Sequence, residues 1–320
     1  MKLIYNGEMD RRLMKDVIGS TLRNCLDRDE NAIYLDADLM NCIGMGDYAK
    51  AHPKRAINCG IAEQNMVGIA CGMAAGGFKP IVHSFGIFAS RRCFDQAFLS
   101  GGYAKNDITI LGSDPGITAA YNGGTHMPFE DMALYRTIPG ATVIDISDTA
   151  MCESVLEQCF DLPGVKYVRL TRKPTVALYA PGEKFEIGRA IVLREGTDVT
   201  LVACGIMVAE ALKAAQQLSS EGISAAVVDM FTVKPLDGET LLALSRKTGA
   251  VVTCENHSMI GGLHAAVAAL LSEEMPVPVG CVAVKDVFGE VGPIDYLRQR
   301  FKLTAEEIVL QAKKTISLKK

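Results

Sequence analysis

Apolar and polar positions along the chain follow two different periods. Residues 12–26 carry apolar side chains three and four positions apart, which predicts a helix with one buried face. Short runs rich in apolar and β-branched residues predict strands, and one of them, residues 32–39, ends with Asp36 and Asp38. Helix and strand patterns then alternate to the end of the chain. This alternation predicts an α/β fold with mostly parallel sheets flanked by helices.

Two such units follow one another in the sequence. We expect the first domain to cover residues 1–180 and the second to cover residues 187–320. Residues 173–187 hold two prolines and no clean period, so they are predicted to form the linker. Within the first domain, Pro128 is expected to begin a helix, because proline fits the first helical turn, and Asp148 is expected to cap the next helix.

The composition excludes several classes of protein. Hydrophobic residues make up 49% of the 320 residues, enough for sizeable cores, and the net charge is −4 with a pI near 5.8. No broad basic surface is implied, so we expect neither a nucleic acid nor a membrane as partner. Ten cysteines are scattered without a CxxC pair, which is typical of reduced core thiols in the cytoplasm and predicts no metal site.

One carboxylate interrupts an otherwise small and apolar helix pattern. The segment "GIAEQNMVGIACG", residues 60–72, contains a single carboxylate, Glu63. Near the start of a helix it interacts favourably with the helix dipole, which is a purely structural explanation. His126 lies in the glycine-rich run "NGGTHMPFED". Such loops often carry function, although capping or surface exposure explains a histidine there equally well.

Phe85 and Phe88 lie at the end of a predicted strand and in the loop after it, just before Arg91 and Arg92. Two phenylalanines by themselves indicate core packing. The neighbouring pair of cations leaves open a second interpretation, in which the two rings form the edge of a pocket.

Taken together, several segments resemble the C-terminal half of transketolase, in order and spacing, over nearly the whole chain. They are "GIAEQNMVGIACGMAAGGFKPIVHSF", "FDQ", "GGTHMPFEDMALYRTIPGATVID", "LTR", "DMFTVKPLD" and "ENHSMIGGL". The resemblance implies that residues 1–180 form the pyrimidine-binding domain of thiamine-diphosphate enzymes. It implies that residues from 187 onward form the transketolase C-terminal domain. It also implies thiamine-diphosphate-dependent transfer of a two-carbon ketol unit from a ketose to an aldose.

The resemblance assigns roles to residues near the cofactor. In the family, the residue that matches Glu63 hydrogen-bonds N1′ of the aminopyrimidine ring and so helps to form the nucleophile at C2 of the thiazolium ring. His126 matches the histidine that binds reacting oxygens of the donor and assists proton transfer. Four more positions match cofactor-binding positions of the family: Phe85 and Phe88 beside the pyrimidine ring, Arg91 in place of the usual aromatic residue, and Asp38 near the subunit interface.

Five positions are expected to bind the substrate, and three of them depart from the family pattern. Arg11 and Arg172 match two arginines that hold the sugar-phosphate terminus. Cys42 replaces a serine that usually binds phosphate, and Asn122 replaces an aspartate that usually reads a substrate hydroxyl. Either Ser113 or Asp114 lies where a histidine is usual. An added carboxylate opposes an anion, so two kinds of substrate stay open: a sugar phosphate, or an unusual, sulfonated or otherwise altered sugar.

The sequence contains no GDG motif of the kind that such enzymes use to hold the diphosphate through Mg²⁺. We therefore expect a separate N-terminal transketolase subunit to hold the diphosphate and the metal. The active site would then lie between chains, most simply in an α2β2 assembly.

Two alternatives remain open at this point. The β subunit of a 2-oxo-acid dehydrogenase E1 has the same two domains, although "GGTHMPFED" and "LTRKPT" favour transketolase. A non-catalytic subunit that keeps the fold is the other alternative. The presence of both Glu63 and His126 argues against it.

Overall fold

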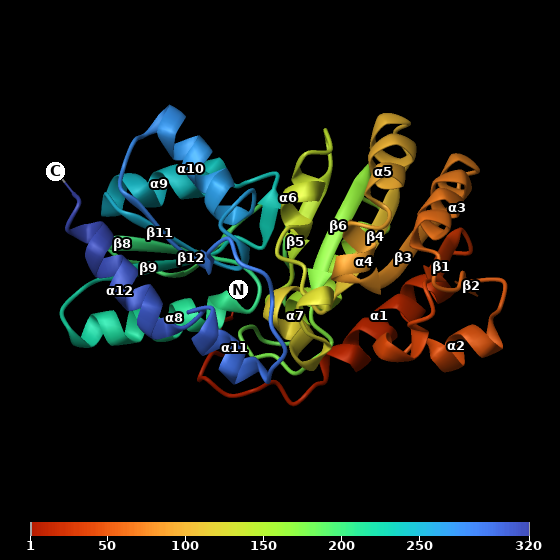
Figure 1. The fold of residues 1–320 in the computed structure, drawn as a ribbon, viewed down its shortest axis with the longest axis horizontal. Helices are drawn as coiled ribbons and strands as arrows, with labels where there is room; N and C mark the ends of the chain where they lie inside the picture. Colours follow the sequence, from red (N-terminus) through yellow and green to blue (C-terminus); the bar gives the residue numbers. More distant parts are fainter. Residues whose placement is uncertain (1, 320) are drawn as a thin grey trace.

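The structure, a computed structural model, describes residues 2–319 and consists of two α/β units that lie side by side (Figure 1). Each unit has a central sheet between two layers of helices, so most strands are covered on both faces. Every residue of β1 (Ala32–Asp36) and of β8 (Val199–Ala203) is buried, which explains their continuous apolar runs. The predicted α/β fold with mostly parallel sheets is confirmed.

The first sheet has seven strands in the order β10-β5-β6-β4-β3-β1-β2. Every neighbouring pair is parallel except β10 and β5. The strands besides β1 are β2 (Ala56–Asn58), β3 (Lys79–Phe85), β4 (Ile108–Ser113), β5 (Thr142–Asp145), β6 (Val165–Leu170) and β10 (Thr232–Lys234).

Helices α1 (Met14–Arg28) and α7 (Thr149–Cys159) pack together on one face of this sheet. Helices α3 (Glu63–Ala75) and α6 (Asp131–Arg136) lie on the other face (Figure 1). The side chain of Asp148 accepts a hydrogen bond from Met151 N–H, which confirms the predicted cap of α7. Shorter helical segments join these elements: α2 (Gly46–Ala51), α4 (Gly86–Ser90), α5 (Phe94–Gln96), η1 (Met40–Ile43), η2 (Ala97–Tyr103), η3 (Gly116–Asn122) and η4 (Gly124–His126).

The second sheet has five strands in the order β12-β11-β8-β9-β7, and only the β7–β9 pair is antiparallel. Helices α8 and α12 pack together on one face, and α9 and α10 lie on the other (Figure 1). The remaining elements are β7 (Ile191–Arg194), β9 (Ala225–Asp229), β11 (Val251–Ser258), β12 (Val279–Val284), α8 (Met207–Ser220), α9 (Gly238–Thr248), α10 (Leu263–Glu274), α11 (Ile294–Arg300) and α12 (Ala305–Ile316).

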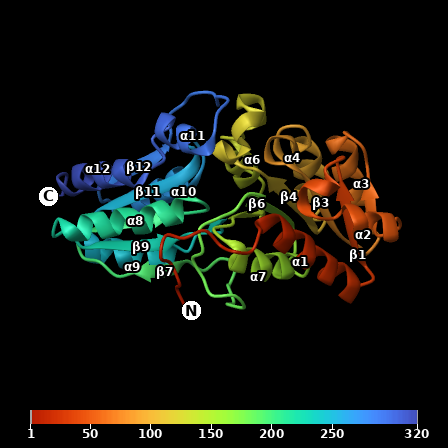
Figure 2. The ribbon, with the colours of Figure 1, turned by 90° about the horizontal axis from the view of Figure 1, so that it is seen from below.

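Backbone pairing connects the units both directly and through the linker. Strand β10 follows β9 in the chain but pairs with β5 of the first sheet, where Thr232 lies opposite Ile144. The N-terminal segment forms single bridges from Leu3 to Tyr179 and from Met9 to Val176, inside the predicted linker. Figure 2 shows this segment running from the second unit to α1 of the first. The domain boundaries near residues 180 and 187 remain a prediction.

One predicted helix start is wrong, because α6 begins at Asp131 rather than at Pro128. The C=O of Pro128 accepts a hydrogen bond from Gly116 N–H at 3.2 Å, and the C=O of Phe129 accepts one from Ser258 N–H at 2.9 Å. Both carbonyls accept hydrogen bonds from distant segments, so neither accepts the first hydrogen bond of a helix.

Candidate active site

The predicted site residues gather at the carboxyl edge of the first sheet. Phe85 is the last residue of β3, Asp114 follows β4 directly, and Arg172 lies just beyond β6. Because these strands are parallel, their carboxyl ends share one edge, which is where ligands bind in open α/β sheets. Glu63 and Phe88 come from the neighbouring helices α3 and α4.

His126 lies edge-on against two phenylalanine rings. Its ring centroid is 6.0 Å from that of Phe85 and 5.1 Å from that of Phe88, in T-shaped arrangements that orient the imidazole. The Oγ1 of Thr125 lies 2.9 Å from Nδ1 of His126. This contact engages Nδ1, so Nε2 is the nitrogen that can face a ligand.

The carboxyl group of Glu63 is bound by Arg92, a residue for which the sequence predicted no specific function. Arg92 Nη1 lies 3.0 Å from Glu63 Oε1, and Arg92 Cζ lies 3.7 Å from the ring centroid of Phe88. The side chain of Glu63 is 5% exposed, whereas that of Arg92 is 47% exposed. An unbroken series of contacts therefore links Glu63, Arg92, Phe88 and His126; we call it the contact series.

Two hollows open along the contact series. The smaller one has a volume of about 300 Å³ and is lined by Ile87, Phe88, Arg91, Arg92, Thr125 and His126. The larger one has a volume of about 400 Å³ and is lined by Ile61, Ala62, Glu63, Gln64, Asn65, Arg91 and Arg92. Because Arg91 and Arg92 line both hollows, these two side chains lie between them.

Arg172 is held by Asp114 next to the aromatic cluster. Arg172 Nε and Nη2 both donate to Asp114 Oδ2, the first at 3.0 Å, and Arg172 N–H donates to Oδ1 at 3.2 Å. Arg172 Cζ lies 4.8 Å from the ring centroid of Phe85. Burial disfavours the charged guanidinium, but Asp114 and the nearby Cys42 outweigh it and raise the pKa of Arg172. The structure thus brings three predicted substrate residues together.

Two predicted cofactor residues make other contacts. Arg91 Nε lies 3.1 Å from Oε1 of Glu130, the residue just before α6. Arg91 thus lines the hollows and is also paired with Glu130. Burial raises the pKa of Glu130. Asp38 Oδ1 accepts a hydrogen bond at 2.9 Å from Nδ2 of Asn58, the last residue of β2.

Two predicted substrate residues lie at the surface. Arg11 is exposed, and Asp10 N–H donates to Thr175 C=O at 2.8 Å, which places Arg11 close in the fold to the residues that follow Arg172. Asn122 is exposed at the end of η3, in the same loop as His126.

The loop that carries His126 is held by the second unit. Asn256 Oδ1 in β11 accepts a hydrogen bond from Ile117 N–H at 3.0 Å, and its Nδ2 donates to Pro115 C=O at 3.0 Å. Gly116 lies between these two residues with φ +53°, and a Cβ atom there would lie 2.2 Å from Asn256 Oδ1. Only glycine permits this approach. Nothing in the sequence near Asn256 indicates which loop it contacts, so its role could not be predicted from local pattern.

A buried ionic group supports the same junction. Arg169 in β6 donates from Nε to Asp131 Oδ2 at 2.7 Å and from Nη1 to Asp145 Oδ2 at 2.9 Å. Its Nη2 donates to the backbone C=O of Asn256 at 2.9 Å. Arg169, Asp131 and Asp145 are buried, so their charges depend on one another and anchor β11 to the first sheet.

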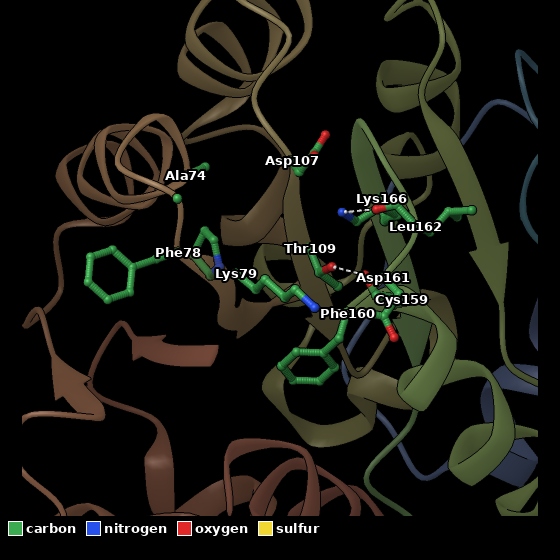
Figure 3. Close-up of a pocket in the computed structure, with 12 residues that line it drawn as sticks. Ala74, Phe78, Lys79, Asp107, Thr109, Cys159, Phe160, Asp161, Leu162 and Lys166 are labelled. Atoms are coloured by element: carbon green, nitrogen blue, oxygen red, sulfur yellow. Dashed lines mark hydrogen bonds and ion pairs between the residues drawn. The ribbon is translucent and has the colours of Figure 1, made fainter. Parts of the chain in front are cut away.

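A separate hollow of about 260 Å³ lies at the opposite, amino edge of the first sheet (Figure 3). Lys79 pairs there with Asp29 at 2.9 Å and with Asp161 at 2.6 Å. Lys166 donates to Leu162 C=O at 2.7 Å, and burial lowers its pKa to about 8. None of the predicted site residues lines this hollow.

Comparison with known proteins decides the family. The family model for the transketolase pyrimidine binding domain matches residues 11–175, and that for the transketolase C-terminal domain matches residues 188–308. The chain belongs to the transketolase family. Members of this family depend on thiamine diphosphate and transfer two-carbon ketol units.

Three relatives illustrate the similarity. The 6-deoxy-6-sulfo-D-fructose transketolase subunit SqwH of Clostridium sp. (strain MSTE9) is 47% identical over 308 residues, which cover 96% of each chain. A solved structure described as split gene transketolase, inactive beta4 tetramer, is 41% identical with a TM-score of 0.88, over 96% of this chain and 99% of that chain. Human transketolase-like protein 2 is 37% identical over 286 residues, which cover 88% of this chain and 45% of that protein.

These findings confirm the resemblance and the prediction of a transketolase-type enzyme that works as part of a complex. They favour this function over that of a 2-oxo-acid dehydrogenase E1 β subunit. All ten cysteines are free, and eight of them are buried. Among the described residues, no helix combines the length and the apolar character needed to cross a membrane.

Proposed function

We propose that this chain is the C-terminal subunit of a two-chain transketolase and that Glu63 and His126 carry the chemistry on its side of the active site. The contact series supports this proposal most directly, because it connects the two residues across Phe88 at the carboxyl edge of the sheet. The two hollows are lined by a buried carboxyl, an aromatic ring and an imidazole. These groups suit a flat nitrogen heterocycle and a polar substrate.

The residues fit the pyrimidine half of thiamine diphosphate. When bound, this cofactor supplies the carbon nucleophile that takes up the ketol unit. Glu63 would hold and move a proton at N1′ of the ring, and Phe85 and Phe88 would wall it, with Arg91 and Asp38 nearer its edge. His126 would present Nε2 to the reacting oxygens of the sugar, since Thr125 engages Nδ1.

The diphosphate and Mg²⁺ would be held mainly by a separate N-terminal subunit, in an α2β2 assembly in the cytoplasm. Mg²⁺ is commonly held by one or two carboxylates together with substrate phosphates, and the sequence lacks the GDG motif for such a site. The similar solved structure is described as an inactive β4 tetramer, which supports the need for a second kind of subunit in that protein.

Calorimetric titration of thiamine diphosphate with Mg²⁺ tests this proposal. We expect binding to the mixture of this chain with its N-terminal partner and none to this chain alone. In the mixture, Glu63→Gln should lower the rate of ketol transfer by a factor of about 100 or more. Glu239→Gln, an exposed site paired with Arg189, serves as the control. Tight binding to this chain alone, or full activity of the Glu63→Gln complex, would overturn the proposal.

We further propose that the donor is a ketose with a terminal sulfonate. Asp114 pairs with Arg172, so this charge pair is nearly neutral and Arg11 supplies the remaining positive charge near the substrate terminus. A sulfonate carries one negative charge, whereas a phosphate monoester carries about 1.5 to 2 at pH 7. A site with about one net positive charge suits the monoanion. The name of the similar SqwH subunit, which contains a 6-sulfo sugar, supports this choice.

A donor panel tests the substrate proposal in the reconstituted complex. The rates with 6-deoxy-6-sulfofructose, fructose 6-phosphate and xylulose 5-phosphate are compared at the same acceptor concentration. We expect kcat/KM to be at least about tenfold higher for the sulfonated ketose, a difference of ~1.4 kcal/mol in transition-state binding. Ordinary rates with xylulose 5-phosphate, together with poor use of the sulfonate, would contradict it.

A further inference from the structure

The guanidinium group of Arg92 makes two contacts at once. It donates to the buried carboxyl of Glu63 at 3.0 Å, and it lies over the Phe88 ring, with Cζ 3.7 Å from the ring centroid. A flat, nitrogen-bearing group that is bonded to Glu63 and stacked on Phe88 is also what the proposed cofactor site requires of the aminopyrimidine ring. The cation and the ring therefore compete for one carboxyl oxygen and one aromatic face.

We propose that Arg92 is a placeholder, which occupies the pyrimidine position of the cofactor-free chain and must swing out before thiamine diphosphate binds. This inference rests on the proposed function and adds to it a residue that sets the affinity for the cofactor. Arg92 is suited to this movement because its side chain is 47% exposed and lies in the turn between α4 and α5. A side-chain rotation releases it, without a change in the sheet or in α3.

The two hollows support the same conclusion. Arg92 lines the hollow beside Glu63 and also the hollow beside His126, so in this conformation it separates them. A cofactor that reacts between Glu63 and His126 needs a continuous space. When Arg92 turns toward solvent, Arg91 is the one side chain shared by both hollows that is left between them.

The placeholder also has a physical benefit for the cofactor-free chain. A buried carboxylate without a partner is costly, and Glu63 is only 5% exposed. Arg92 supplies the missing partner, and stacking on Phe88 adds a cation–π contact. Binding of the cofactor must first break both contacts. The apparent Kd therefore equals the intrinsic Kd divided by the fraction of molecules in which Arg92 is undocked.

The expected effect follows from the strength of these contacts. A partly exposed ion pair together with a cation–π contact favours the docked state by about 5- to 30-fold. Arg92→Met should therefore lower the Kd of thiamine diphosphate by about 5- to 30-fold in the complex with the N-terminal subunit. Arg92→Lys keeps the charge but loses the flat stack, so its Kd should fall between those of the wild type and Arg92→Met.

Calorimetric titration of thiamine diphosphate with Mg²⁺ into the reconstituted complex measures these constants without relying on turnover. Arg189→Met serves as the matched control, because Arg189 is also exposed and ion-paired but lies in the second unit. We expect its Kd to equal that of the wild type. An unchanged or higher Kd for Arg92→Met would overturn the placeholder proposal. The arginine would then either have no effect on cofactor binding or contribute to the bound site.

A second variant separates failure of the inference from failure of the proposed function. Glu63→Gln should raise the Kd in the same complex, because the amide cannot share a proton with N1′. If Glu63→Gln weakens binding while Arg92→Met does not strengthen it, only the placeholder is wrong. If Glu63→Gln leaves the Kd unchanged, or if the wild-type complex binds no cofactor, both the proposed site and the placeholder proposal are wrong.

Discussion

Replacement of Asn256 by alanine tests whether the second unit fixes the loop that carries His126. Asn256 is 2% exposed, and its side-chain amide makes both of its hydrogen bonds to that loop. The bonds run from Ile117 N–H to Oδ1 and from Nδ2 to Pro115 C=O, each 3.0 Å long. Alanine removes both partners and leaves two backbone groups unpaired in a buried place.

The structure sets the size of the expected loss. A buried polar group that loses its partner costs about 1–3 kcal/mol, so two such groups cost roughly 2–6 kcal/mol. The variant no longer has to bury the amide of Asn256 itself, which offsets part of this cost. We therefore expect the free energy of unfolding to fall by about 2–4 kcal/mol.

Urea unfolding and amide hydrogen exchange provide the assay. The Ile117 amide should exchange at least about tenfold faster in Asn256→Ala under native conditions, because the loop opens locally. Asn24→Ala, at an exposed position of α1, serves as the control and should leave both quantities nearly unchanged. A stability loss below about 0.5 kcal/mol, with unaltered exchange at Ile117, would refute the reasoning.

Three further predictions concern buried or paired charges. Asp114→Asn frees Arg172 from its carboxylate, so kcat/KM for phosphorylated donors should rise about three- to tenfold relative to sulfonated ones; an unchanged ratio in the donor panel would count against the charge argument. Burial raises the pKa of Asp229 to about 8, above its value of ~3.9 in the unfolded chain, so the folded chain loses stability as pH rises from about 4 to about 8. Asp229→Asn should lower the pH dependence of the unfolding free energy by up to ~1.4 kcal/mol per pH unit, as measured by urea titrations. Equal pH slopes for the variant and the wild type would exclude Asp229 as the cause of this loss. Arg169→Met leaves two buried carboxylates without their cation and should cost about 3–5 kcal/mol in unfolding free energy, whereas a loss below ~1 kcal/mol would show that the group is not coupled.

Local pattern was sufficient for much of the fold. Hydrophobic periodicity predicted the alternating helices and strands, because burial on one helix face or on both faces of a strand leaves a direct trace in the order of residues. The cap at Asp148 was predicted correctly for the same reason, since it depends on residues three apart. The start of α6 was predicted wrongly because the carbonyls of Pro128 and Phe129 bond to segments far away in the chain. No local rule contains that information.

The sequence by itself determined which residue types are present for the chemistry: a lone carboxylate in a small-residue helix, a histidine in a glycine-rich loop, and an aromatic pair. Only the tertiary structure decided which of them meet. It placed Arg92 between Glu63 and Phe88, paired Arg172 with Asp114, and brought Asn256 from the second unit under the loop of His126. The physical reason is that these contacts join separate strand ends and helices, and parallel strands align their carboxyl ends only after the sheet has formed.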